Sequence, residues 1–207
     1  MPSIYDLKPA FQGLLRPLVG GLARSGVTAN QVTVAAMLLS LVTGAVIAWQ
    51  PGQRSWLLLL PGVLFLRMAL NAVDGMLARE HDQKSRLGAV LNELCDVFSD
   101  AALYLPLALV PGFHGPLVVL IALLAAASEM TGVLMQTLGA SRRYDGPMGK
   151  SDRAFVFGAL GLALGLGAPA GTWLTAVLAL VSVLLAWTIL NRAGRGLAEG
   201  AQSCSRP

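Results

Sequence analysis

Residues 71–100 read NAVDGMLAREHDQKSRLGAVLNELCDVFSD, and this stretch decides how the chain folds because it sets polar side chains within apolar surroundings. Asn71 and Asp74 are three residues apart, so they share one face of a predicted helix. The next apolar segment carries polar residues at intervals of four, which again share one face: Asn92, Asp96 and Asp100. The short loop 80–86 joins the two segments, so a helical hairpin brings the two polar faces together.

The rest of the chain is too apolar for a soluble domain. Its 207 residues are 55% hydrophobic and 13% charged, whereas soluble domains carry about 25% charged residues. Crossing a bilayer takes about 20 apolar residues, and the sequence offers six such segments, of which the fifth is short: 31–50, 56–78, 87–110, 116–138, 153–167 and 172–190. We therefore predict an all-α fold, an integral membrane bundle of six transmembrane helices preceded by an N-terminal interfacial amphipathic helix.

The N-terminal helix is predicted from apolar residues that recur every three or four positions: Ile4, Leu7, Phe11, Leu14, Leu18 and Leu22. Basic residues lie off this stripe, as is typical of a helix lying on a membrane surface, although an ordinary packed helix is the alternative. The early sequence lacks an apolar core segment, so no cleaved signal peptide is expected. The chain is one membrane-embedded domain, with 1–28 as the interfacial helix, 29–192 as the bundle and 193–207 as a polar cytoplasmic tail.

Basic residues set the orientation, because cytoplasmic loops are enriched in Lys and Arg. They gather before the first segment and after the second, fourth and sixth: Lys8, Arg16, Arg24, Arg79, Lys84, Arg86, Arg142, Arg143, Lys150, Arg192, Arg195 and Arg206. The opposite loops carry only Arg54 and His114. We expect a multi-pass protein of the cytoplasmic membrane with both termini in the cytoplasm. The net charge of +4 then comes from basic loops that face an anionic lipid leaflet. No nucleic acid is expected as a partner.

The polar residues within the segments indicate function, because each charge at the bilayer centre costs about 2.5–3.5 kcal/mol on insertion scales. Oxygen ligands on two facing helices suit Mg²⁺ or Mn²⁺. Gly75 and Gly88 leave space beside these oxygens and Arg79 adds a cation, so the hairpin suits a phosphate ligand held together with a metal. A buried ion-pair network and a proton path are the alternatives.

The hairpin resembles the signature of the CDP-alcohol phosphotransferase family, D-x-x-D-G-x-x-A-R followed by G-x-x-x-D-x-x-x-D. The matching positions in this chain are Asn71, Asp74, Gly75, Ala78 and Arg79, then Gly88, Asn92 and Asp96. Two shorter elements are also similar. Asn30 and Thr33 match a P-N-x-x-T element before the first span, although Ala29 stands where that element has its proline. Gly149-Lys150-Ser-Asp-Arg153 is similar to a G-K-x-[KR] element before the fifth span.

The chain departs from the family pattern at two positions, where Asn71 and Asn92 replace aspartates. An amide oxygen still ligates a metal but brings no charge, so each exchange weakens the metal site. Two neighbouring carboxylates lie close enough to add charge. Asp100 continues the stripe of Asn92, whereas Glu93 points about 100° away around the helix and is the poorer substitute. A weakened family member is therefore one alternative to an active enzyme.

The resemblance implies a transfer of the phosphatidyl group from CDP-diacylglycerol to a small alcohol, with release of CMP, in phospholipid biosynthesis. Asp96 matches the family's proposed general base, which takes the proton of the acceptor hydroxyl. The implied ligands of Mg²⁺ or Mn²⁺ are Asn71, Asp74, Asn92 and Asp96. The implied contacts to the nucleotide and its diphosphate are Asn30, Thr33, Gly75, Ala78, Arg79, Ser85 and Gly88.

The acceptor is less defined by the sequence. The loop before the fifth segment is strongly basic, and such a cluster favours a phosphorylated alcohol such as glycerol 3-phosphate or inositol phosphate. Its candidate acceptor residues are Arg142, Arg143, Lys150 and Arg153. Ordinary positive-inside bias explains the same cluster without an acceptor.

The expected partners are CDP-diacylglycerol, the polar alcohol, membrane lipid and a second copy of the chain in a homodimer. A small transporter or proton-coupled channel is the rival function, and it predicts polar stripes that continue to the far side of the membrane. A structural assembly protein is a third possibility, but it leaves the Asp-Gly-x-x-Ala-Arg spacing unexplained. The short fifth segment also contains Gly161 and Gly165, whose spacing favours close helix packing.

Overall fold

The computed structural model describes the backbone of residues 4–204 and the side chains of residues 11–201, and within these ranges it is helical without a strand. The elements follow one another along the chain as α1 (Ile4–Arg24), α2 (Ala29–Trp49), η1 (Arg54–Leu58), α3 (Leu59–Glu80), α4 (Arg86–Tyr104), η2 (Leu105–Leu109), α5 (Gly115–Thr137), α6 (Lys150–Gly165) and α7 (Thr172–Cys204). The predicted all-α class is therefore confirmed.

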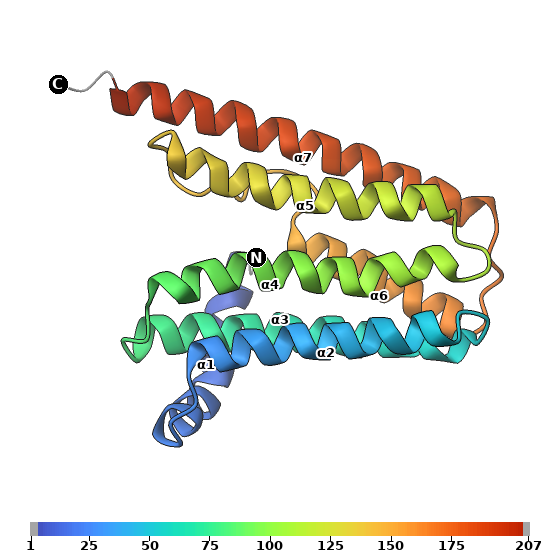
Figure 1. Cartoon of the computed structure of the whole chain (residues 1–207), viewed down its shortest axis with the longest axis horizontal. Coiled ribbons are helices and arrows are strands. Elements are labelled where there is room, and N and C mark those ends of the chain that lie inside the picture. The colour runs from blue at the N-terminus through green and yellow to red at the C-terminus, as the bar shows by residue number, and fades with distance from the viewer. Residues whose placement is uncertain (1–3, 205–207) are drawn as a thin grey trace.

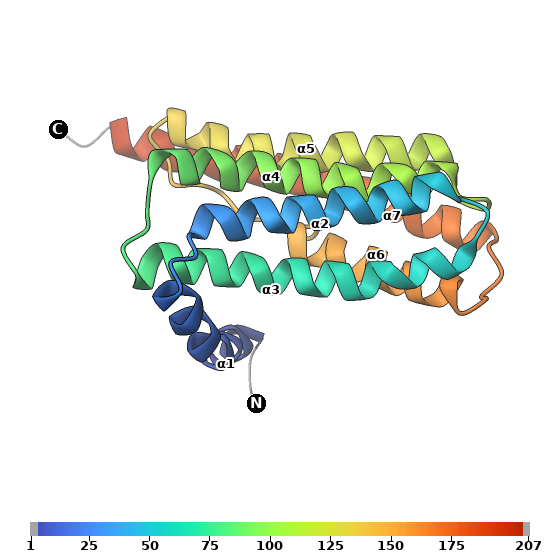
Figure 2. The same ribbon diagram turned by 60° about the horizontal axis from the view of Figure 1, so that its bottom comes forward.

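Six long helices run roughly parallel or antiparallel in an elongated bundle, and α1 projects from one end of it (Figures 1 and 2). Helix α2 packs on α3 and α4, α3 packs on α6, and α5 packs on α7. The α3–α4 loop, the α5–α6 loop and the C-terminal end of α7 all lie at the end of the bundle near α1, which we call the motif end. The α5–α6 loop folds back from this end, so that α6 begins part of the way along the bundle.

Four helical segments are long and apolar enough to cross a membrane: 29–49, 54–80, 115–137 and 172–201. The other two predicted spans correspond to α4 with η2 and to α6. Helix α4 is continuous, but charged residues interrupt its apolar sequence. Helix α6 has only 16 residues. The count of six transmembrane helices consequently stays a prediction, although all six predicted segments are helical.

Two boundaries differ from the prediction. The second span is preceded by the short helix η1, which packs on α6. The last helix continues to Cys204, through most of the region predicted as a polar tail. Contacts with the α5–α6 loop order its last turns. A hydropathy pattern does not reveal such contacts. Arg206 lies outside the described residues.

Helix α1 is confirmed as a helix, whereas its position on a membrane surface stays a prediction. Val19 is fully buried and packs in a small cluster with residues of α2 and α3. Leu14 and Leu18 remain exposed. Arg16 pairs with Glu80 at 3.1 Å and joins α1 to the end of α3. The side chains of Ile4, Leu7 and Lys8 lie outside the described residues.

Close packing of α6 depends on its glycines. A Cβ atom added to Gly161 would lie 2.8 Å from the carbonyl oxygen of Leu57, and one added to Gly165 would lie 2.7 Å from the side chain of Leu58. The contact at Gly161 is with backbone, so a side chain there would force the two helices apart. The predicted role of the GxxxG spacing in close helix approach is confirmed, and the contact holds α6 against η1 at the end of the bundle opposite the motif end.

Candidate functional site

Local capping holds the start of α2 against the α3–α4 loop at the motif end. Thr28 caps α2 in a reciprocal arrangement with Gln31, and the Ser85 hydroxyl accepts a hydrogen bond from Gly88 N at 2.9 Å at the start of α4. Gln83 bridges the two regions. Its amide oxygen accepts from Ala29 N at 2.7 Å, and its amide nitrogen donates to the carbonyl of residue 27. The sequence prediction did not identify Gln83.

A cavity of about 420 Å³ lies between these elements. It is lined by all seven predicted nucleotide-contact residues, Asn30, Thr33, Gly75, Ala78, Arg79, Ser85 and Gly88, together with Ala29, Asp74, Gln83, Lys84, Ala89, Asn92 and Glu93. We call it the nucleotide cavity. The helical hairpin has thus gathered residues from positions 29 to 93 around one space, as the sequence pattern predicted, while the role of each residue remains a proposal.

The glycines keep the nucleotide cavity open. A Cβ atom at Gly88 would lie 2.8 Å from the amide oxygen of Asn30, and one at Gly75 would lie 3.1 Å from the Arg79 guanidinium. The N-termini of α2 and α4 also border this space, and free backbone N–H groups at a helix N-terminus favour anions. The cavity therefore combines space, a cation and two helix N-termini.

A second cavity of about 640 Å³ lies next to the first, and Asn92 lines both. It is lined by mostly polar and charged residues from α3, α4, α5, the α5–α6 loop, the start of α6 and α7: Asn71, Asn92, Asp96, Glu129, Arg142, Tyr144, Gly146, Gly149, Lys150, Ser151, Asp152 and Arg192. We call it the acceptor cavity. Of its lining residues, the sequence prediction missed Glu129, Tyr144 and Arg192 as site residues, because α5, α7 and the folded loop meet here only in the tertiary structure.

Asp96 is one of three carboxylates that line the acceptor cavity, with Glu129 and Asp152, and it is surrounded by hydrogen-bond donors. Its Oδ2 lies 2.5 Å from Lys150 Nζ. Its Oδ1 accepts from Asn71 Nδ2 at 3.3 Å and from Arg67 Nη2 at 3.4 Å. Arg67 also donates to the Asp96 backbone carbonyl at 3.0 Å, so one guanidinium holds both the backbone and the side chain of this residue.

The four predicted metal ligands line the two adjoining cavities. Asp74 lines the nucleotide cavity, Asn71 and Asp96 line the acceptor cavity, and Asn92 lines both. Asp74 accepts a hydrogen bond from the Thr33 hydroxyl at 2.7 Å. Asn71 and Asn92 each direct the amide nitrogen to a carboxylate, Asp96 and Glu93 respectively, which leaves both amide oxygens available. Among the described residues, no three His, Cys, Asp or Glu side chains converge, because two of the four positions are asparagine. Two carboxylates and two amide oxygens suit one divalent cation that also binds substrate phosphates.

Asp100 does not supply charge to this group of ligands, contrary to the prediction. Its carboxylate pairs with Arg67 and, at 2.7 Å, with Arg153. Arg153 also lies 3.1 Å from Glu129. Arg67 and Arg153 are 1% and 0% exposed, so these four residues form the buried ion-pair network that was the alternative interpretation. Such a network satisfies the charges within the bundle without lipid contact.

The predicted acceptor residues are only partly brought together. Arg142 and Lys150 line the acceptor cavity, whereas Arg143 and Arg153 do not. Arg153 turns into the buried network, and Arg143 turns away to Asp145 and Glu199, at 2.7 and 2.5 Å. Arg142 lies 2.5 Å from Glu93, and its guanidinium covers the Tyr144 ring at 4.6 Å. The loop thus contributes two cations to the cavity.

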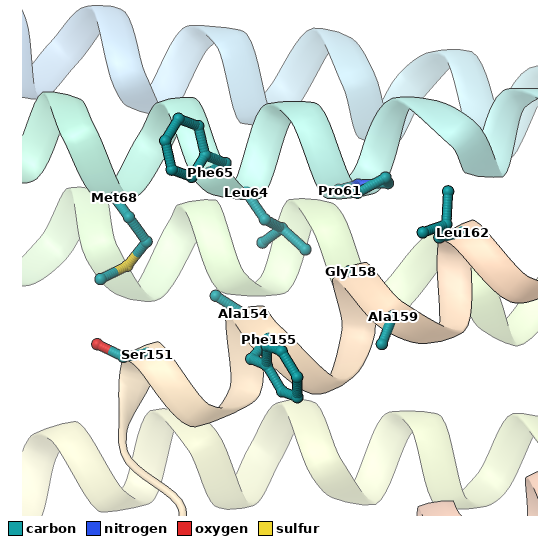
Figure 3. Close-up of a pocket in the computed structure, with 10 residues that line it drawn as sticks. All are labelled: Pro61, Leu64, Phe65, Met68, Ser151, Ala154, Phe155, Gly158, Ala159 and Leu162. Carbon is teal, nitrogen blue, oxygen red and sulfur yellow. The ribbon is translucent and has the colours of Figure 1, made fainter. Parts of the chain in front are cut away.

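An apolar cavity of about 380 Å³ lies between α3 and α6 and reaches the polar site at one end (Figure 3). Ser151 lines both this cavity and the acceptor cavity. Phe65, Phe155 and Leu162 are exposed at its surface, and Gly158 leaves room beside Pro61. An exposed apolar groove on the bundle surface thus ends beside the polar residues of the acceptor cavity.

Comparison with known proteins identifies the family of the chain. A profile of the CDP-alcohol phosphatidyltransferase family matches residues 26–190. The chain is 48% identical over 190 residues to the inner membrane protein YnbA of Escherichia coli (strain K12), which covers 92% of this chain and 94% of that protein. It is 35% identical over 99 residues to the phosphatidylinositol phosphate synthase of Mycobacterium marinum, covering 47% of this chain and 40% of the synthase.

Solved structures share the fold. The crystal structure of Mycobacterium tuberculosis phosphatidylinositol phosphate synthase in complex with manganese and citrate superposes with a TM-score of 0.73 over 87% of this chain and 88% of that one. The same enzyme with CDP-DAG bound gives 0.72 over 89% and 92%. Both are 23% identical to this chain. On the match that spans residues 26–190, the chain belongs to the CDP-alcohol phosphatidyltransferase family.

Proposed function

We propose that this protein transfers the phosphatidyl group of CDP-diacylglycerol to the hydroxyl of a small phosphorylated alcohol and releases CMP. The observation that carries the proposal is the junction of the two cavities at Asn92. One cavity has the features of a nucleotide diphosphate site, and the other presents a carboxylate among several cations. A donor and an acceptor bound in adjoining cavities meet where Asp74, Asn92 and Asp96 lie.

The donor site combines three surfaces suited to one CDP-diacylglycerol molecule. The nucleotide cavity offers Arg79, Lys84 and two helix N-termini to the cytidine and diphosphate. The apolar cavity between α3 and α6 suits an acyl chain, because a lipid tail in this groove keeps its headgroup near Ser151. The M. tuberculosis relative, whose fold is similar, has been crystallised with CDP-DAG bound.

Asp74 and Asp96, with the amide oxygens of Asn71 and Asn92, would hold one Mg²⁺ or Mn²⁺. A bound divalent ion neutralises charge on the diphosphate and on the departing CMP. The M. tuberculosis relative was crystallised with manganese. Because only two of the four positions carry charge, we expect the site to hold its ion weakly and to depend on the substrate diphosphate for part of the binding.

Asp96 is the proposed general base. An alcohol is a weak nucleophile, and a carboxylate within hydrogen-bond reach takes its proton as the oxygen attacks phosphorus. The acceptor oxygen forms the new bond to the β-phosphorus, the bond from that phosphorus to the CMP oxygen breaks, and the proton passes to Asp96. Arg67, which is buried behind the cavity wall, and Asn71, which lines the cavity, both donate to the Asp96 carboxylate and hold it in place.

The acceptor class follows from the charge of its cavity. Three cations, Arg142, Lys150 and Arg192, line it together with three carboxylates, Asp96, Glu129 and Asp152. Cations that can exchange a carboxylate partner for a phosphate favour a phosphorylated acceptor over a neutral alcohol. Arg143 and Arg153, which were also predicted to bind the acceptor, support this site through other residues. We further propose a six-span arrangement in the cytoplasmic membrane with both termini cytoplasmic, and a homodimer, as the sequence predicted.

The test is a panel of acceptors with purified protein, radiolabelled CDP-diacylglycerol and Mg²⁺. Glycerol 3-phosphate and inositol phosphate are each paired with the unphosphorylated alcohol. We expect a new labelled lipid and stoichiometric CMP with a phosphorylated member only. Transfer to the unphosphorylated members with equal efficiency would reject the acceptor class, and no lipid product with any acceptor would reject the transferase function.

A further inference from the structure

The last turns of α7, beyond the predicted sixth span, hold the loop that joins α5 to α6. Four α7 residues contact this loop, and their spacing of four, three and four places them on one helix face: Thr188, Arg192, Arg195 and Glu199. The face runs along the loop from residue 148 to residue 141. We call this face the α7 clasp; two of its residues, Arg195 and Glu199, lie in the region predicted to be a tail.

Glu199 makes the most contacts at the outer end of the clasp. One carboxylate oxygen accepts from Ser141 N at 2.9 Å, and the other accepts from the Ser141 hydroxyl at 3.0 Å. Arg143 Nη1 lies 2.5 Å from the same carboxylate. Charge-assisted hydrogen bonds of this kind are the stronger ones in proteins, so Glu199 fixes both the backbone and a side chain of the loop.

The middle of the clasp holds Asp145. Its carboxylate lies 2.7 Å from Arg143 and 2.7 Å from Arg195, and its backbone carbonyl accepts from Arg192 Nε at 3.3 Å. Arg192 is 2% exposed, donates to the Ser128 carbonyl at 2.6 Å and lines the acceptor cavity. The clasp therefore connects directly to a cation of the site.

Space around the loop is restricted on both its α5 side and its α7 side. A Cβ atom on Gly132 of α5 would lie 2.6 Å from the Arg143 carbonyl, and one on Gly146 would lie 2.6 Å from Thr188. Gly146 also has a φ of 120°, which side chains rarely adopt. Contacts on both sides leave the loop with one path, and on that path Arg142 and Tyr144 line the acceptor cavity.

We infer that Glu199 is a positioning residue for acceptor recognition: through Ser141 and Arg143 it holds the loop that carries Arg142 and Lys150 to the acceptor cavity. Glu199 itself does not line that cavity, so its effect passes through the loop. The inference rests on the proposed function, since it specifies how the acceptor site of that function is built. It predicts that loosening the clasp weakens the acceptor without affecting the donor.

The experiment compares wild type with Glu199→Gln. The acceptor is glycerol 3-phosphate or inositol phosphate, whichever the wild type uses better. Because the variant loses a charge-assisted pair, we expect the KM for this acceptor to rise about three- to tenfold. The KM for CDP-diacylglycerol should stay unchanged. Glu80→Gln is the matched control, because Glu80 also pairs with an arginine at similar exposure but joins α1 to α3. The control should leave the acceptor KM at the wild-type value.

Two further measurements need no turnover. Trypsin cleavage after Arg142 or Arg143 should accelerate in Glu199→Gln by a similar factor, because cleavage follows the population of the released loop. Binding of inorganic phosphate, measured by equilibrium dialysis, should weaken to the same extent. An unchanged cleavage rate, or faster cleavage with unchanged phosphate binding and acceptor KM, would overturn the inference. A wild-type protein without transferase activity would instead reject the proposed function, and cleavage and dialysis would still decide the role of Glu199.

Discussion

Lys150 Nζ lies 2.5 Å from the Asp96 carboxylate, across the acceptor cavity from α4 to the first residue of α6. The two residues come from motif elements 54 positions apart, and their contact joins the proposed base to a proposed acceptor cation. On the proposed function, a phosphorylated acceptor whose phosphate contacts Lys150 would bring its hydroxyl near Asp96.

Lys150→Met should weaken a phosphorylated acceptor, because methionine keeps the length of the side chain but removes its charge. We expect the acceptor KM to rise about tenfold. Lys150→Arg is the matched variant, and it should retain more of the affinity because it keeps the charge. Steady-state kinetics with varied acceptor at saturating CDP-diacylglycerol measures this. Equal KM values for Met and wild type would remove Lys150 from the acceptor site.

Chelation of divalent ions should abolish CMP release, and Mg²⁺ or Mn²⁺ should restore it. Because Asn71 and Asn92 bring no charge, Asn71→Asp or Asn92→Asp should lower the ion concentration for half-maximal rate at least about threefold. Mn²⁺ binding to each purified variant, followed by electron paramagnetic resonance, gives a second readout without turnover. If neither variant changes the ion dependence or the binding, these two residues do not contact the metal.

Asp100→Asn should destabilise the protein strongly, because it leaves Arg67 and Arg153 buried without their shared carboxylate. Breaking a buried ion pair costs about 3–5 kcal/mol, so a chain of this length should lose about 10 °C in Tm. Thermal unfolding in detergent measures the effect. Glu80→Gln, which breaks an exposed pair, should change Tm little. Equal Tm values for Asp100→Asn and wild type would show that the network does not hold the bundle together.

Asp145 should make a pH-dependent contribution to loop attachment. Burial raises the pKa of its carboxyl, but hydrogen bonds from Arg143 and Arg195 outweigh burial and lower this pKa below its usual value. A lowered pKa gives stability that is fully present above the ordinary value of about 3.9 and is lost as pH falls through the folded-state pKa. The Tm difference between wild type and Asp145→Asn should thus be constant near neutral pH and shrink only in acid. A difference that already disappears near pH 6 would contradict the lowered pKa.

The helical hairpin was predictable because its information is local. The spacing of Asn71, Asp74, Asn92 and Asp96 fixes which side chains share a helix face, and the short loop between them leaves only a hairpin. The seven nucleotide contacts that the family resemblance implied line one cavity; five lie on the hairpin, whereas Asn30 and Thr33 come from α2. The helices were also predictable, because each predicted span was identified from the length of its apolar segment and each of these segments is helical in the structure.

The acceptor side was less predictable because it depends on tertiary contacts. Charge alone does not indicate whether an arginine of the loop faces a cavity, and Arg153 instead enters a buried network with Asp100 and Glu129. The extension of α7 was missed for a related reason. Its polar sequence gives no apolar pattern, and its order comes from Glu199 and Arg195 contacting a loop about 50 residues earlier.

The central claim is that Asp96 takes the acceptor proton in phosphatidyl transfer. The most direct measurement is CMP release from CDP-diacylglycerol by Asp96→Asn, with Mg²⁺ and a phosphorylated acceptor both saturating and with thermal unfolding as a check on folding. A positioned base contributes about 10²–10⁴-fold to rate, so the account predicts a fall of at least about a hundredfold in kcat with a folded protein. A folded Asp96→Asn that keeps more than about a tenth of the wild-type kcat would contradict it.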